Sequence, residues 1–600
     1  MTTSCSEPLY FGAPGAEAFG WLHRPSTAPA RRLGLVICSP IGAGDHAAHR
    51  GLRQLATEAA EMAVPTLRFD FPANGDSAGE ASECDHPSAW ARAVHQAIDT
   101  LRARTGVTKV CIVAPRLAAL PGAQAASERD DVSAFIALAP VLRGRNFLRE
   151  SMLRSAGGAV GALADLEVAG HVLTLRARAE LAECDLLGLA RPPAPRILVI
   201  DTDGLHASDR WVAHLRDQGA RCDTRIEPTL VNMTEGEADA SVPRALISQL
   251  AAWVASGAEP QAAPATGAPA GPVAPEVLGR AELQLDGVRE TPFPFELANT
   301  ALFALLTEPS LAPPRRAVLL LNTGPARRIG PSRMHVIWAR RWARDGVAVM
   351  RLDLPGLGDS EAEAGEREGE AYAITSAPAI ALALAELRLR FGAVDCQVIG
   401  ICSGAFHAYR AAVAGLPIQA VVLINQAAYR WGARSRLDRP SMAWRLAWVL
   451  KQRGDPSAAA PATPLQRLKW RAIHAALLAR AGLRAMAGAL GWQVANDTGA
   501  ELKALARRGV AVHVICADRD RGMALLNLEA PHAVKTLQRG GELTLETITD
   551  ADHIFTSRQS RERLQLALDR IVHAPAAALP EPRNAGVDSS LPSATAISLH

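Results

Sequence analysis

The sequence predicts an α/β protein made of two fused, doubly wound domains, with mostly parallel sheets and helical caps. Short apolar runs alternate with amphipathic segments along most of the 600 residues, which is typical of parallel strands and their crossover helices. The same order of segments occurs twice. In the second copy, one apolar strand ends in a turn of small residues that leads directly into a helix.

In the first copy, residues 8–23 are expected to form a short strand pair that turns at Pro14-Gly15. Apolar runs after this pair indicate buried strands, and the segments between them have helical periodicity. The expected strands are 35–39, 65–69, 109–113 and 196–200, and the expected helices are 50–62 and 88–104.

The second copy repeats this order, with strands at 317–321 and 348–352 and a helix at 333–345 between them. Both copies carry a related decapeptide at a strand end: RFDFPANGDS begins at Arg68 and RLDLPGLGDS begins at Arg351. The decapeptides agree at Arg, Asp, Pro, Gly, Asp and Ser. Because the match lies in equivalent strand and helix contexts, it predicts two copies of one fold.

Composition sets the domain boundaries. Residues 257–277, GAEPQAAPATGAPAGPVAPEV, are rich in Ala, Pro and Gly and nearly uncharged, which is typical of a linker. The linker separates a first half, residues 1–256, from a second half, residues 278–575. Residues 576–600 are rich in Pro, Ala and Ser and are expected to be disordered.

Bulk properties exclude several classes of protein. A net charge of +3 gives no footprint for nucleic acid. The nine cysteines show no metal-binding spacing and no disulfide framework, so neither a metal nor a cofactor is expected. The chain starts without a basic and apolar leader and has no apolar run long enough for a membrane span. We therefore expect a cytoplasmic protein, where a free thiol survives.

The turn in the second copy reads Gly400-Ile401-Cys402-Ser403-Gly404, between an apolar run and a helix. Small residues two before and two after the apex resemble the nucleophile elbow of α/β-hydrolases, with Cys402 where the common motif has serine. Ser403 is the rival apex, but it would put bulky Ile401 where a small residue is required. A buried cysteine in a structural turn is the alternative without chemistry.

Both halves resemble α/β-hydrolases of the serine-aminopeptidase-like, esterase and thioesterase superfamily, over about 30–255 and 295–572. Through RFDFPANGDSAG and LEVAGHVLTLRARAEL, the first half is also similar to hydrolase-like proteins associated with bacterial exosortase systems. The cysteine at the elbow is similar to the nucleophile of dienelactone hydrolases and polyhydroxyalkanoate synthases. The resemblance implies a nucleophile, an acid and a histidine in that chain order.

The second half supplies an acid and a histidine in that order. Its late strands are expected at 512–516 and 543–548. Asp520 follows the first of these strands and His553 follows the second, with Asp518 as the rival acid. A thiolate–imidazolium pair between Cys402 and His553 is expected, because an imidazolium and a helix N-terminus both favour a thiolate.

The oxyanion is expected to be held by two backbone N–H groups. One belongs to Ser403, directly after the nucleophile. The other belongs to the loop after strand 317–321, near Asn322, Thr323 or Gly324. The side chain of Asn322 is a further donor, unless it serves only to form the turn.

A basic run, Arg327, Arg328 and Arg333, follows this loop. It has two interpretations: a contact for a substrate carboxylate or phosphate, or a solvated basic surface. Two insertions, about 146–190 and about 430–495, lie where lids of such folds occur. The second holds five tryptophans and is interpreted as an apolar helical cap or as a helical subdomain core: Trp431, Trp444, Trp448, Trp470 and Trp492.

The first half does not supply a complete set. Its elbow position holds Arg116, and no histidine occurs between Cys222 and Leu250. An acid is still present near Asp203. We interpret this half as a pseudo-hydrolase that serves packing, docking or access, with Arg116 either binding an anion or pairing with Asp203.

The resulting hypothesis is a cysteine-dependent acyl hydrolase or acyltransferase. Its substrate would be a thioester or ester on a small molecule or a carrier protein, in polyketide, lipid or peptide biosynthesis. The alternative is a scaffold in which neither half is catalytic. The sequence indicates no oligomeric state.

Overall fold

The computed structural model describes the following residues: 5–25, 32–41, 45–80, 86–154, 165–168, 171–202, 208–234, 241–257, 278–373, 375–392, 394–431, 497–575 and scattered positions between 472 and 486. They belong to two compact units, Met1–Val394 with Asp550–Leu566 and Asp395–Thr549 with Ala567–His600. The predicted linker after Gly257 and the predicted tail lie outside the described residues. So do four tryptophans of the predicted cap: Trp444, Trp448, Trp470 and Trp492.

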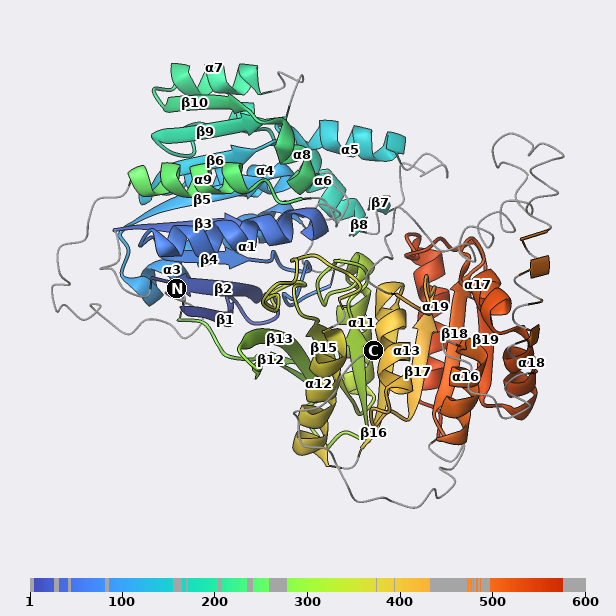
Figure 1. The fold of residues 1–600 in the computed structure, drawn as a ribbon. Coiled ribbons are helices and arrows are strands. Elements are labelled where there is room, and N and C mark those ends of the chain that lie inside the picture. Colours follow the sequence, from blue (N-terminus) through green and yellow to red (C-terminus); the bar gives the residue numbers. More distant parts are fainter. Residues whose placement is uncertain are drawn as a thin grey trace. The chain divides into compact units, whose positions relative to one another are not determined.

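The first unit contains an eight-stranded sheet that belongs to the first half (Figure 1). Its strands, in sheet order, are β1 (Cys5–Phe11), β2 (Ala18–Arg24), β4 (Thr66–Phe69), β3 (Leu33–Cys38), β5 (Lys109–Pro115), β6 (Val132–Leu138), β9 (Arg196–Asp201) and β10 (Arg221–Ile226). The pairs β1–β2 and β2–β4 are antiparallel, and the other pairs are parallel. The predicted strand pair and the predicted mostly parallel sheet are confirmed.

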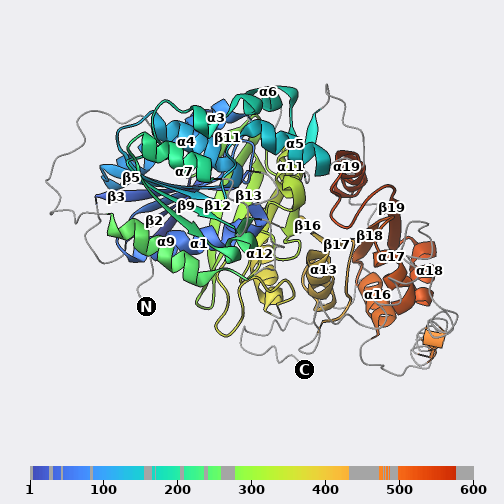
Figure 2. The same ribbon diagram turned by 90° about the horizontal axis from the view of Figure 1, so that it is seen from above.

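Helices cover both faces of this sheet, because the central strands are apolar on both faces. In β3, Leu35 and Ile37 face one core and Val36 and Cys38 face the other. The covering helices are α1 (Asp45–Glu61), α3 (Pro87–Thr105), α4 (Ala119–Ser127), α7 (Asp209–Asp217) and α9 (Arg244–Ser256). Figure 2 shows α1 and α9 on one side of the strands and α3, α4 and α7 on the other.

The first predicted insertion, 146–190, contains both helix and strand. Its described elements are α5 (Gly144–Arg154), β7 (Leu166–Val168), β8 (His171–Leu173) and α6 (Leu175–Glu183). The strands β7 and β8 form an antiparallel pair. Among the described helices, none combines the length and the apolar character that crossing a membrane requires.

A second sheet of nine strands belongs to the second half. Five strands lie in the first unit, in the order β11 (Leu283–Leu285), β12 (Val288–Leu297), β13 (Thr300–Pro309), β15 (Val347–Asp353) and β14 (Arg316–Leu321). Four lie in the second unit, in the order β16 (Asp395–Ile401), β17 (Ala420–Ile424), β18 (Ala511–Ala517) and β19 (Leu543–Ile548). The associated helices are α11 (Met334–Arg344), α12 (Ser376–Phe391), α13 (Ser403–Val413), α16 (Thr498–Arg507), α17 (Gly522–Glu529), α18 (Pro531–Gly540) and α19 (Arg558–Val572).

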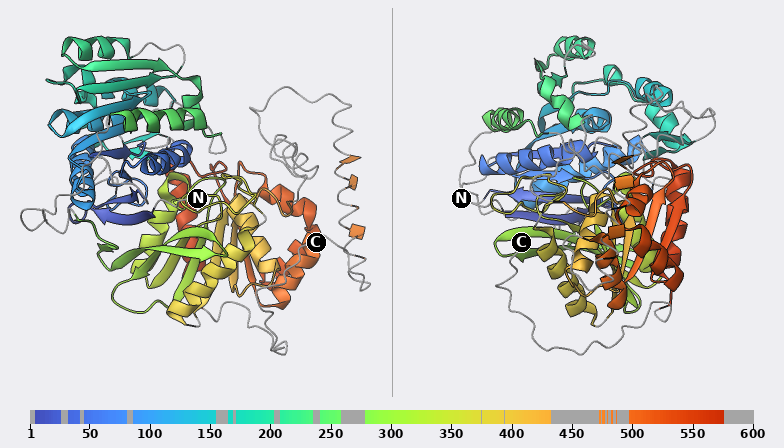
Figure 3. Two further views of the ribbon diagram at one scale, coloured as in Figure 1. Left: turned by 60° about the vertical axis from the view of Figure 1, so that its left-hand side comes forward. Right: turned by 45° about the vertical axis from the view of Figure 1, so that its right-hand side comes forward.

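The strand order β1-β2-β4-β3 of the first sheet is repeated by β12-β13-β15-β14 of the second. In each set the first two pairs are antiparallel and the third pair is parallel. The two sets can be followed in Figure 3, the first in blue and the second in green. The repeat predicted from the decapeptides is therefore present in the topology as well as in the sequence.

Within the first unit, the two decapeptides contact each other through buried charges. We call these residues, with two arginines of the loop after β14, the junction network: Arg68, Asp70, Asp76, Arg327, Arg328, Arg351, Asp353 and Asp359. The pairing is reciprocal. Arg68 of the first decapeptide donates to Asp359 of the second at 2.6 Å, and Arg351 of the second donates to Asp76 of the first.

Apolar side chains of both halves pack beside the junction network. The Trp21 ring of β2 contacts the Phe303 ring of β13, with centroids 4.7 Å apart. These rings belong to a buried cluster drawn from both halves: Tyr10, Phe19, Trp21, Ala78, Leu283, Phe303 and Leu305. The first half and residues 278–373 of the second half therefore share a continuous buried interior.

The sequence-based interpretations of the basic run were both wrong for Arg327 and Arg328. These side chains are neither solvated nor directed at a substrate, because each is almost completely buried and paired with carboxylates. Arg333 is also engaged, since it donates to the backbone carbonyls of Gly75 at 2.8 Å and Gly79 at 3.1 Å. Burial and the neighbouring Arg340 lower the pKa of Arg333 to about 9.

Candidate active site

Cys402 stands at the apex of a sharp turn between β16 and α13. Its backbone has φ of 57° and ψ of −110°, and its N–H donates to the carbonyl of Ile424 at 2.9 Å. A positive φ costs a residue with a side chain about 1–3 kcal/mol and persists only where the surroundings impose it. Ser403 is already the first residue of α13 and is buried, so the apex of the turn is Cys402.

The glycine before the apex is required by the close approach of the strand to the helix. A Cβ atom at Gly400 would lie 2.1 Å from the carbonyl carbon of Gly404 and 2.5 Å from the nitrogen of Ala405. Both contacts are with backbone, which cannot move aside without opening the turn. The small-residue spacing in the sequence therefore has a steric cause.

Both candidate acids, Asp520 and its rival Asp518, follow the strand β18. The strands β16, β17 and β18 run parallel, with Ile401 paired to Ile424 and Ile424 paired to Ile515. The carboxyl ends of these strands therefore meet at one edge of the sheet, which brings Cys402 and the loop after β18 to the same edge within the second unit. Asp520 in this loop is buried and accepts a hydrogen bond from the N–H of Gly522 at 2.7 Å.

The rival acid is placed differently. Asp518 is half-buried, and its backbone N–H continues the ladder to β19 by donating to the carbonyl of Ile548 at 2.8 Å. Burial and a fixed hydrogen bond hold the Asp520 carboxylate in one orientation, which a histidine-orienting acid needs.

We therefore expect Asp520→Asn to lower kcat by roughly 10²–10⁴-fold, since an amide cannot stabilise an imidazolium as a carboxylate does. Asp518→Asn should lower kcat less than about ten-fold. Steady-state kinetics on one small activated ester, with circular dichroism as a control for folding, measures both. Equal losses in the two variants would leave the acid unassigned.

Sequence reasoning missed Gln426, which follows β17 at the same edge. Its side chain is buried, and its Nε2 donates to the carbonyl of Ala428 at 2.9 Å. Its Oε1 is buried and accepts no hydrogen bond from the part of the chain that the structure describes. The available signal was its place directly after a parallel strand, where functional side chains of α/β sheets gather.

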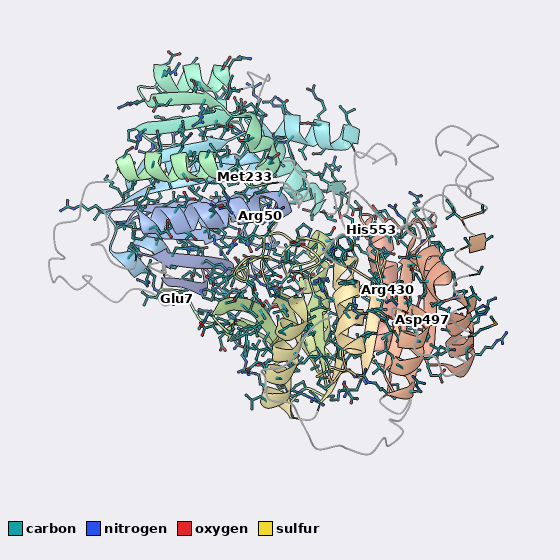
Figure 4. The ribbon with its side chains drawn as sticks, viewed as in Figure 1. Glu7, Arg50, Met233, Arg430, Asp497 and His553 are labelled. Atoms are coloured by element: carbon teal, nitrogen blue, oxygen red, sulfur yellow. The ribbon has the colours of Figure 1, made fainter. Side chains whose placement is uncertain are left out.

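His553 lies in the loop between β19 and α19 and is half-buried (Figure 4). This is the predicted place in the chain, after the last strand. Residues 550–566 group with the first unit, whereas Cys402 and Asp520 belong to the second. The pairing of His553 with Cys402 stays a prediction.

The predicted oxyanion loop follows β14 in the first unit. The side chain of Asn322 is completely buried and donates to the carbonyl of Ala326 and to Asp353, both at 2.9 Å. Its Oδ1 accepts from the N–H of Leu354 at 2.8 Å. These bonds occupy the side chain in forming the turn, so the amide of Asn322 is not left to donate to an oxyanion. The Thr323 hydroxyl is buried with no hydrogen-bond partner among the described residues.

Comparison with known proteins identifies one matching family. Residues 318–564 match the Alpha/beta hydrolase family. The fold is that of an α/β-hydrolase. No curated protein matches the chain.

Solved structures are similar at low identity. Est1E from Butyrivibrio proteoclasticus is 16% identical, with 42% of this chain and 96% of that chain covered and a TM-score of 0.32. A dienelactone hydrolase from Anabaena variabilis is 14% identical, with 47% and 96% covered and a TM-score of 0.30. An esterase from Pyrococcus furiosus is 14% identical, with 47% and 89% covered and a TM-score of 0.29.

The first half of the chain has an elbow-like turn without a nucleophile. Arg116 has φ of 50°, directly after β5, and is the first residue of a short 3₁₀ helix, Arg116–Ala118, that leads into α4. Asp201 at the end of β9 accepts a hydrogen bond from Ser208. Asp203, the other partner considered for Arg116, lies outside the described residues. The backbone of the elbow has thus been retained at a position whose side chain cannot act as a nucleophile.

For this reason Arg116→Ala should change kcat on a small activated ester by less than about two-fold. The guanidinium is not a nucleophile, and the sequence has no histidine between Cys222 and Leu250, where the base of this half would be expected. Steady-state kinetics on the full-length variant and the wild type measure the change in kcat. A loss of ten-fold or more would contradict the interpretation of the first half as a pseudo-hydrolase.

Proposed function

We propose that the second half is a cysteine-dependent acyl enzyme that acts on a thioester or an ester. Cys402 would be the nucleophile, His553 its base and Asp520 the acid that orients His553. The observation that carries the proposal is the strained backbone of Cys402 at the junction of a buried strand and a helix. Strain of this kind is retained at reactive side chains, where it exposes the side chain at the sheet edge.

In the proposed reaction, His553 takes the proton of the Cys402 thiol, and the thiolate sulfur attacks the carbonyl carbon of the substrate. The backbone N–H groups of Ser403 and of the loop at Asn322 and Thr323 would stabilise the resulting oxyanion. Collapse of the tetrahedral intermediate breaks the bond to the leaving thiol or alcohol, which receives the proton from His553. The product of this step is an acyl-thioester on Cys402.

The second step transfers the acyl group from Cys402. Water gives a thioesterase or esterase, and an amine, thiol or carbanion acceptor gives an acyltransferase. A thioester reacts with all of these acceptors, so a cysteine in place of serine favours transfer or thioester substrates. The proposed substrates are acyl groups on a small molecule or a carrier protein, in polyketide, lipid or peptide biosynthesis.

Three of the other thiols that the structure describes interfere little with a test of Cys402. Burial raises the pKa of Cys111 to about 12 and the pKa of Cys184 and Cys222 to about 11. Because the thiolate is the nucleophile, these thiols react slowly at neutral pH. Cys402, in contrast, is half-buried at the apex of an elbow.

The decisive experiment is intact-mass spectrometry after mixing with a panel of acyl thioesters and activated esters. We expect one acyl adduct per chain, located on Cys402 by peptide mapping and absent from Cys402→Ala. An adduct on Ser403, or none with any substrate that is turned over, would contradict the proposal. Labelling with iodoacetamide separates the scaffold alternative, in which Cys402 would react no faster than an ordinary free thiol.

A further inference from the structure

We infer that Asp70 and Asp76 of the first half are positioning residues for the oxyanion loop of the second half. The loop is residues 322–328, between β14 and the start of α11. This inference rests on the proposed function, because it gives the loop a catalytic purpose. It assigns to the degenerate half a role in the chemical step, beyond docking and access.

The loop is held in place from both ends. At its start, Asn322 bonds to Ala326 and Asp353, and the N–H of Ala326 donates to the carbonyl of Thr323 at 3.2 Å. At its end, the backbone N–H of Arg328 donates to Asp353 at 2.6 Å. The backbone N–H groups that would face an oxyanion therefore lie in a turn whose two ends share one carboxylate.

The first half supplies the remaining carboxylates. Arg327 makes a two-pronged contact with Asp70, at 2.9 and 3.0 Å, and Arg328 pairs with Asp76 at 2.7 Å. All four side chains are buried, so each arginine needs a carboxylate partner to be tolerated there. Loss of Asp70 removes the two-pronged contact of Arg327, and loss of Asp76 removes one of the three carboxylates that hold Arg328, so in either variant the loop is held less firmly.

The negative charge of Asp76 is well maintained. Burial alone would raise the pKa of Asp76, but Arg328, Arg351 and Arg327 outweigh it and hold the pKa below its ordinary value. Asp76 is also held by Arg351, from the second decapeptide. Asp70 accepts the backbone N–H of Asp76 at 3.0 Å, so the two acids form one rigid turn.

The two loops that follow β3 and β14 differ in their arginines. The loop of the first half, after β3, reads PIGAGDH over 40–46 and contains no arginine. The loop of the second half therefore places two arginines against the turn of the first half, whereas the loop of the first half has no arginine to place in return. This asymmetry matches the division between a half with a nucleophile and a half without one.

The test uses Asp70→Asn and Asp76→Asn in the full-length chain. Both variants should lower kcat on a small activated ester by roughly 10–100-fold with KM changed less than two-fold, since a displaced oxyanion donor is felt in the transition state. Alkylation of Cys402 by iodoacetamide forms no oxyanion, so its rate should stay within about two-fold of the wild type. This split distinguishes positioning from general damage to the fold.

Glu368→Gln is the matched control. Glu368 accepts from Arg53 at 2.6 Å across the same two halves, on the exposed side and away from the loop. The kcat of the Glu368→Gln variant should equal that of the wild type. If Asp76→Asn does not fold, Asp70→Asn decides, because it leaves the contacts of Arg328 intact.

Hydrogen exchange supplies a readout that needs no activity. In Asp70→Asn, amides between 324 and 330 should exchange at least about ten-fold faster, with the strands unchanged. Equal losses of acylation and alkylation, or unchanged kcat and exchange, would overturn the inference. Activity retained by Cys402→Ala would instead overturn the proposed function, and the exchange experiment would still decide whether the first half positions the loop.

Discussion

Replacing Cys402 with alanine should lower turnover of any ester or thioester substrate by at least about 10⁴-fold, because removal of a nucleophile leaves only binding and oxyanion contacts. The same variant should form no acyl adduct. Ser403→Ala should keep measurable activity, since Ser403 lies inside α13 and its backbone N–H, the proposed oxyanion donor, is retained. Steady-state kinetics and intact mass on the same preparations measure both effects.

The matched variant is Cys402→Ser, which keeps the shape of the apex and replaces the thiol with a hydroxyl. It should retain weak esterase activity, because a histidine base can still activate a serine. Iodoacetamide labelling of this variant should lose the fast phase that the wild type shows. Full activity in Cys402→Ala together with none in Ser403→Ala would move the nucleophile to Ser403 and remove the case for thiol chemistry.

The sequence predicted those features that depend on residues close together in the chain. Apolar runs identified β3, β5 and β16, because a strand buried on both faces needs continuous apolar residues. The glycine spacing identified the elbow, because the crowding of Gly400 against Gly404 is local. The decapeptides identified the repeat, which β4 and β15 confirm.

Two features were beyond the reach of the sequence. The strand β12 contains Pro292 and Pro294, which argue against a strand. The structure accommodates both, because β11 pairs only with Val288–Glu290 and leaves the edge of β12 open beside the prolines. The charged loop at Arg327 and Arg328 is the second feature. Its partners in the first half, Asp70 and Asp76, are more than two hundred residues away, and a polar loop whose partners are unknown is indistinguishable from a solvated one.

Removal of the first half should prevent the second half from folding stably. In a fragment of residues 278–600, Arg327 and Arg328 lose the carboxylates of Asp70 and Asp76, and Arg351 loses that of Asp76. Breaking one buried ion pair by removing a partner costs about 3–5 kcal/mol. Arg328 keeps Asp353 and Asp359, and Arg351 keeps Glu290, so this cost falls mainly on Arg327. One loss of this size is already a large fraction of the net stability of a domain, about 5–15 kcal/mol. The fragment should also expose Phe303 and Leu305, which are buried in the intact chain.

We expect residues 278–600 expressed alone to be mostly insoluble and inactive, and to become soluble when residues 1–277 are co-expressed as a separate chain. The control is cleavage of the full-length protein within 257–277, which removes no buried contact of the described residues and should leave the two pieces associated. Size-exclusion chromatography, thermal melting and ester hydrolysis measure these outcomes. A soluble and fully active 278–600 fragment would contradict the role of the junction network, because the second half would then have folded without the carboxylates of Asp70 and Asp76.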